Sequence, residues 1–193
     1  MSTPALQTED ILWAVKYVLR AQLPASLLEV QTRRNAELDP LTLEPRCSVT
    51  LPLPVRIDLG FDENVLYLPI TAFPRVNVIG APLSPNNPLR GDQRIAEATH
   101  DVLLEWLTFN ALRSGVPAEE IKTEAVCMAV RYGEAIIAVL RQGGSYAGFE
   151  PPSIIPAVDE GQPMIWKDRE TGAELGYLTG GTITLPVTGR YTA

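Results

Sequence analysis

Residues 117–141 constrain the fold of this 193-residue chain more than any other stretch. Pro117 suits the first turn of a helix, and Glu119 and Glu120 suit the positive end of the helix dipole. Apolar side chains then recur at helical spacing: Ile121, Ala125, Met128, Tyr132, Ile136 and Val139, widened by Val126, Val130, Ile137 and Leu140. The remaining polar face is narrow: Glu120, Glu124, Arg131, Glu134 and Arg141. Such a helix must be buried on most sides, by a sheet on one side and either the N-terminal helix or another subunit on the other.

A strand precedes this helix. Residues 75–81 alternate apolar and polar side chains, with Val76 and Val78 on one face, as in a half-buried strand. The prolines of residues 82–94 then interrupt the pattern. Residues 97–109 are ambiguous, because a strand and a helix would each align an apolar face. We favour a strand, since 102–109 can pair with 75–81 in an antiparallel hairpin with a long arm; the helix remains the alternative.

The flanking regions complete the expected elements. Thr8 is a plausible N-cap for a helix over residues 9–23 that Pro24 ends, and a second short helix over 27–36 would carry Arg33 and Arg34 outward. Six prolines between residues 40 and 74 predict a Pro-rich loop region with short edge strands at 47–51 and 65–68. Residues 164–188 predict a β-meander with strands at 164–167, 175–178 and 181–187, a turn at 168–172, and the glycine-rich residues 178–182 as a second turn.

Together these elements predict one α+β domain spanning residues 1–193. Its sheet is mainly antiparallel with a long hairpin, and an N-terminal helix and one long central helix pack against it. A chain of this length can bury a substantial core, about 70% of its unfolded surface.

Charge and cysteine content narrow the function. A net charge of −7 argues against tight non-specific binding of DNA or RNA, which needs clustered Lys and Arg. Cys47 and Cys127, the only cysteines, form neither a disulfide framework nor a paired zinc motif, and two lone thiols suit a reducing compartment. The N-terminal residues lack the pattern of a signal peptide, and no apolar run approaches the ~18 residues needed to cross a bilayer.

Catalytic motifs are lacking in the sequence. His100 is the only histidine, and its simplest interpretation is a strand or helix residue near the surface. Ser145 lies in Gly143-Gly144-Ser145-Tyr146-Ala147, which approximates a nucleophile elbow but follows a helix where an elbow would follow a strand. The acidic pairs have no liganding periodicity. We therefore expect no enzyme activity, no cofactor and no metal site.

The order of elements resembles that of the tail-terminator and tail-completion proteins of long-tailed bacteriophages. The residues that carry the resemblance are the helix over 9–23, the strand that begins Phe73-Pro74-Arg75-Val76-Asn77-Val78, the segment from Glu97 to Leu104 after a polar loop, and the helix through Arg131-Tyr132-Gly133-Glu134-Ala135-Ile136. Such proteins are small α+β proteins of the phage neck. They form rings, usually hexameric, that cap the tail tube and join it to the head connector.

The resemblance implies a structural protein of the virion neck or tail, assembled in the host cytoplasm. Its partners would be further copies of itself, the tail tube protein, the head–tail connector or adaptor proteins, and genomic DNA that passes through the ring without specific binding; no membrane is involved. The loop over 82–94 should project as an arm. We expect the assembly interface to include the following residues: Pro85, Asn86, Asn87, Arg90, Asp92, Glu124 and Arg131.

Two alternatives stay open. One is another head–tail connector, or an assembly adaptor unrelated to phage that would be a stable monomer or dimer. The other is an enzyme whose carboxylates come together only in the fold, which would need a deep pocket with two or more carboxylates of perturbed pKa.

Overall fold

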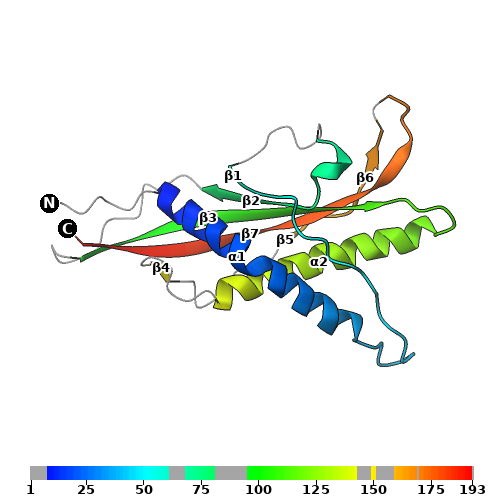
Figure 1. Cartoon of the computed structure of the whole chain (residues 1–193), viewed down its shortest axis with the longest axis horizontal. Helices are drawn as coiled ribbons and strands as arrows, with labels where there is room; N and C mark the ends of the chain where they lie inside the picture. Colours follow the sequence, from blue (N-terminus) through cyan, green and yellow to red (C-terminus); the bar gives the residue numbers. More distant parts are fainter. Residues whose placement is uncertain are drawn as a thin grey trace.

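The computed structural model describes residues 8–60, 68–80, 95–142, 149–150, 159–168 and 170–192. Two helices pack on one face of a mostly antiparallel sheet (Figure 1), which confirms the predicted α+β fold. The helices are α1 (Thr8–Asn35) and α2 (Ala118–Gln142). Along the sequence, one group of strands precedes α2 and a second group follows it. The sheet is therefore completed only by residues that follow that helix.

The sheet is organised around two long strands, β3 (Ile95–Ala111) and β7 (Glu174–Thr192). The strand order is β1-β2-β3-β7, with β1 (Arg56–Leu59) parallel to β2 (Arg75–Gly80) and the other pairs antiparallel. The free side of β7 is covered by three short strands, β4 (Phe149–Glu150), β5 (Asp159–Glu160) and β6 (Met164–Lys167). A short 3-10 helix, η2 (Ile70–Ala72), precedes β2.

The predicted hairpin between 75–81 and 102–109 is confirmed. β2 pairs with β3 in a register that sets Arg75 opposite Leu107 and Gly80 opposite Val102. The ambiguous segment 97–109 is therefore strand. Pairing on both sides resolves the ambiguity, because β3 also pairs along its whole length with β7, from Ile95 opposite Thr192 to Ala111 opposite Gly176.

The predicted C-terminal meander is confirmed in part. β6 and the turn at 168–172 form as expected, the turn being closed by hydrogen bonds to the Asp168 carboxylate that lower its pKa. The second turn at 178–182 is wrong, because β7 continues straight through those residues. Glycine is needed in β7 because the main chain of β3 approaches it closely. A Cβ on Gly180 would lie 2.0 Å from the main-chain oxygen of Trp106, and one on Gly176 would lie 2.1 Å from that of Asn110.

The prediction that Pro24 ends the first helix is also wrong. α1 runs unbroken for 28 residues with Pro24 inside it, so the separate helix over 27–36 does not exist. Proline removes one main-chain hydrogen bond from a helix interior. The defect is tolerated because Pro24 lies on the exposed face, whereas Leu23 and Leu27 on either side are buried in the core and hold both halves of the helix.

The long central helix forms as predicted and lies over β3 and β7 (Figure 1). The side chains of its predicted apolar row are all buried: Ile121, Ala125, Met128, Tyr132, Ile136 and Val139. Trp106 of β3 is fully buried beneath it and donates its indole N–H to the carbonyl oxygen of Ala129, 2.8 Å away. Of the two predicted covers for this helix, α1 supplies the second, as it packs directly against α2.

Residues 46–55, which we call the strap, lead from the loop after α1 into β1 and form hydrogen bonds with both helices. The predicted edge strand at 47–51 is wrong: these residues form no strand and pair with no described strand. Side-chain amides of α1 form the hydrogen bonds with the strap main chain that a neighbouring strand would otherwise form. Asn35 both accepts from the Val49 N–H (3.1 Å) and donates to the Val49 carbonyl (3.0 Å), and Gln31 accepts from the Leu51 N–H (2.7 Å). Most of the other predicted edge strand, at 65–68, lies outside the described residues.

Candidate functional site

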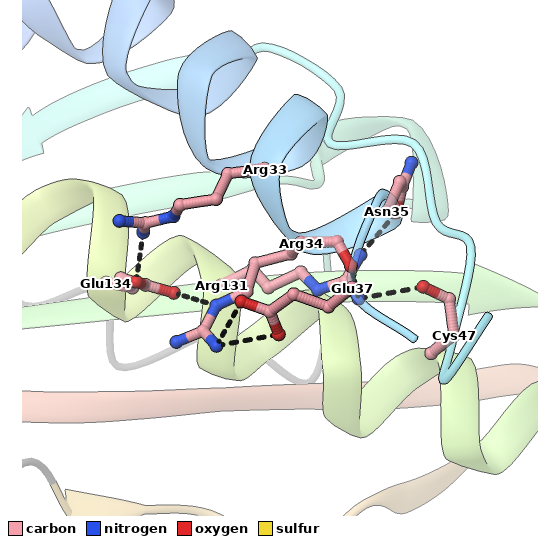
Figure 2. A network of polar contacts seen from close by, with 7 residues as sticks. All are labelled: Arg33, Arg34, Asn35, Glu37, Cys47, Arg131 and Glu134. Atoms are coloured by element: carbon pink, nitrogen blue, oxygen red, sulfur yellow. Dashed lines mark hydrogen bonds and ion pairs between the residues drawn. The ribbon is translucent and has the colours of Figure 1, made fainter. Parts of the chain in front are cut away.

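The C-terminal end of α1 is clamped to α2 by ion pairs (Figure 2). Arg33 and Arg34, in the last turn of α1, both bind the carboxylate of Glu134 on α2, with Arg34 Nε 2.8 Å from Glu134 Oε2. Hydrogen bonds to Glu134 and then Glu37 raise the pKa of Arg34 above its ordinary value, and the bond from Arg34 lowers the pKa of Glu37. The prediction that these arginines point outward holds for Arg33, whose side chain is 54% exposed, but both also reach across to α2.

Arg131 of α2 holds the strap. Its buried guanidinium donates to the Asn35 side-chain oxygen (2.6 Å) and to the Cys47 carbonyl oxygen (2.8 Å), as Figure 2 shows. The next residue of α2 is Tyr132, whose hydroxyl donates to the Pro52 carbonyl oxygen, and burial raises the pKa of Tyr132. Polar residues of the predicted polar face of α2, such as Arg131 and Glu134, thus bind groups of the same chain.

The two cysteines lie together, which the sequence analysis missed. Cys47 is in the strap and Cys127 is on the side of α2 that faces it; both are free thiols, partly exposed, and packed against the main core. Burial, followed by the neighbouring thiol of Cys127, raises the pKa of Cys47 to about 12. Their proximity depends on the path of the strap, which no local motif encodes.

The outer face of α1 carries an exposed apolar row that we call the α1 strip: Trp13, Tyr17 and Leu28. Their exposed fractions are 50%, 72% and 64%. The spacing of four and eleven residues places all three on one helical face. Trp13 is held in place, because its indole N–H donates to Glu9 (3.3 Å) and the Lys16 ammonium lies 5.0 Å from the ring centre.

Beside the strip, a groove of about 340 Å³ lies between the middle of α1 and the start of β1. Its rim carries the exposed cations Arg20 and Arg56, and Leu53 and Val55 add exposed apolar surface. β1 is also the end strand of the sheet, and no described strand pairs with its outer edge. An apolar strip, two arginines and an open strand edge thus meet on one side of the molecule. Such surfaces mark protein interaction sites.

A second groove, of about 360 Å³, lies on the sheet face opposite the helices. Leu107, Leu178 and Met164 give it an apolar floor, and Glu105 is the one carboxylate among its described lining residues. The Glu105 carboxylate accepts a hydrogen bond of 2.7 Å from Asn77 of the neighbouring strand. The first groove likewise contains one carboxylate, that of Asp58, which pairs with Arg75. Among the residues that the structure describes, neither groove brings together the two carboxylates that the enzyme alternative requires.

The residues expected at an assembly interface fall into two groups. Glu124 pairs with Arg113 at the start of α2, and Arg131 is buried in the contacts described above. Those contacts lie within one chain, and a role between chains stays a prediction for both residues. The others lie outside the described residues: Pro85, Asn86, Asn87, Arg90 and Asp92. Ser145 also lies outside them, and His100 is in β3, opposite Val187.

Metal chemistry has no candidate in the part of the chain that the structure describes, where no three His, Cys, Asp or Glu side chains are grouped to hold an ion. Neither described helix is long and apolar enough to cross a membrane. A comparison with models of known protein families gives no match, and neither does a comparison with curated proteins. The surfaces described above are therefore the features of this chain that bear on its function.

Proposed function

We propose that this chain is a structural protein of a phage neck or tail that assembles into a ring, ends the tail tube and joins it to the head connector. The α1 strip is the observation that carries the proposal. Exposed aromatic and leucine side chains on one helical face are costly to leave in water and are typical of a surface that another protein covers. The α+β fold with a central hairpin agrees with the resemblance to tail terminators.

The occupant of the strip would be a neighbouring copy of the same chain. Arg20 and Arg56 flank the strip and form no ion pair with any residue that the structure describes, whereas the chain as a whole carries a net charge of −7. The acidic surface of a second copy would complement them. A contact between the strip and a different surface of the next copy is heterologous, and heterologous contacts close into rings when the rotation allows. The net negative charge would also let DNA pass through the ring without binding to it.

The proposal is tested by placing one charge on the strip. Tyr17→Glu should leave folding intact, because the side chain is 72% exposed, but it should weaken assembly by about 2 kcal/mol or more, roughly thirtyfold in affinity. Leu41→Glu is the matched control, since Leu41 is 91% exposed and lies away from the strip, in the loop after α1. Both variants would replace the native chain in the assembling particle, with ring occupancy counted by electron microscopy.

The expected result is a ring at the neck with the native chain and with Leu41→Glu, and empty or unjoined tails with Tyr17→Glu. Finding a single copy of the chain in each particle would exclude the ring. A stable monomer or dimer that never enters a particle would favour the assembly-adaptor alternative. Equal assembly of both variants would remove the α1 strip from the interface.

A further inference from the structure

The strap brings one cysteine to the side of α2 that carries the other. Arg131 donates to the Cys47 carbonyl oxygen at 2.8 Å, and residues four apart on a helix lie on the same face, so Cys47 lies next to Cys127. Both side chains pack against the same core cluster while staying partly exposed. A small reagent can therefore reach thiols that the fold has already paired.

The Cys47 thiol is a poor nucleophile in the folded chain. The pKa of Cys47, raised to about 12 by burial and by the adjacent thiol, keeps this residue protonated at neutral pH. Since the thiolate is the nucleophile in disulfide exchange, we assign the first attack to Cys127, an order that the two single cysteine variants test. Cys47 then resolves the product, because it is the thiol already in place beside Cys127.

We propose that Cys47 and Cys127 are a modification site at which small disulfides, such as oxidised glutathione, introduce a reversible cross-link between the strap and α2. The Cys127 thiolate attacks one sulfur of the reagent, forms a mixed disulfide and releases one thiolate. The Cys47 thiol loses its proton to solvent and attacks the Cys127 sulfur, which releases the second thiolate. Two protein thiols are oxidised, and one disulfide reagent is reduced to two thiols. This site does not depend on the proposed function.

The cross-link would replace polar contacts by a covalent one. At present Asn35, Gln31, Arg131 and Tyr132 hold the strap through hydrogen bonds. A disulfide that closes so long a loop restricts the unfolded chain strongly. The oxidised protein should therefore be more stable than the reduced one, and the wall of the groove that continues from the strap should be fixed more firmly.

The test treats the reduced full-length chain with oxidised glutathione and follows the free thiols and the intact mass. Both thiols should disappear together, the mass should fall by two hydrogen atoms, and a digest without reductant should yield one peptide pair joined through Cys47 and Cys127. The Tm should rise by about 5 °C or more and return when reductant is added.

Two single variants make the result specific. Cys47→Ser should stop at the glutathione adduct on Cys127, and Cys127→Ser should react slowly or not at all. A wild-type chain that keeps stable adducts, forms disulfides only between chains, or retains both thiols while folded would overturn the proposal. The wild-type measurement alone decides the matter if a serine variant fails to fold.

Discussion

The two helices are similar in length but opposite in how their side chains are used. α2 buries its apolar row against the sheet and α1, and its polar groups Arg131 and Glu134 are occupied by the end of α1 and the strap. α1 buries one face and leaves the α1 strip in solvent. A helix flanked by partners within its own chain has little apolar surface left to offer, whereas a helix at the margin of the fold has more.

The apolar surface that a neighbouring chain could cover therefore lies mainly on α1, and not on α2 as the sequence suggested. From the sequence, the apolar surface of residues 117–141 suggested a second partner, either the N-terminal helix or another subunit. The structure satisfies that need within the chain, through α1. The exposed apolar surface that remains for a neighbour belongs to α1. The sequence pattern of that helix explained its buried face and gave no sign of a second, exposed apolar face.

The strongest way to break the comparison is to place the same charge on each helix. Ile136→Asp puts a carboxylate at a fully buried position of α2, where an unpaired buried charge costs roughly 3–5 kcal/mol or more, so the chain should unfold or nearly so. Leu28→Asp makes the corresponding change on the exposed strip of α1 and should alter stability by less than about 0.5 kcal/mol. Urea unfolding followed by circular dichroism measures both. Similar losses in the two variants would mean that the α1 strip is buried in solution.

An intermediate effect should separate the two kinds of arginine. Arg131→Met leaves the Cys47 carbonyl and the Asn35 side-chain oxygen short of a buried donor, at a cost of about 1–3 kcal/mol. Arg33→Met removes one exposed partner of Glu134, which keeps its bond from Arg34, and should cost under about 1 kcal/mol. Protease resistance of the strap should fall in the first variant only. A larger loss of stability for Arg33→Met would show that the ion pairs with Glu134, and not the strap, hold the two helices together.

The smallest expected effect has the opposite sign. Pro24→Ala restores a main-chain donor in the middle of α1 and should raise stability by about 1–2 kcal/mol, after allowance for the greater entropy of the unfolded chain. Pro54→Ala is the control, because Pro54 lines the same groove but is not helical. Thermal unfolding compares the two. No gain at position 24 would mean that the ring of Pro24 makes contacts that offset the lost hydrogen bond.

Hydrophobic periodicity predicted the elements that face the core. The row from Ile121 to Val139 identified α2, and the alternation around Val76 and Val78 identified β2 and, through pairing, the strand at 97–109. These patterns are local consequences of burial, so a sequence displays them directly. The α+β class followed from them.

The features that were missed depend on tertiary contacts. Pro24 and Gly180 usually interrupt regular structure, yet buried neighbours hold α1 together around the proline, and close approach of β3 requires the glycine. The partners of Arg131 and the pairing of Cys47 with Cys127 come from chain segments far apart in sequence. The α1 strip was not recognised either, because exposure can be judged only once the covering elements are known.

The pairing of β3 with β7 also determines the order in which the two edges of β3 can be paired during synthesis. β2 and β3 are near neighbours along the chain, but Ile95 pairs with Thr192, so β3 cannot complete its second edge until the ribosome has made α2 and most of β7. During that interval one long strand edge stays open, and open edges are where newly made chains associate wrongly. The distance between β3 and β7 along the sequence therefore sets how long this edge stays unpaired during synthesis.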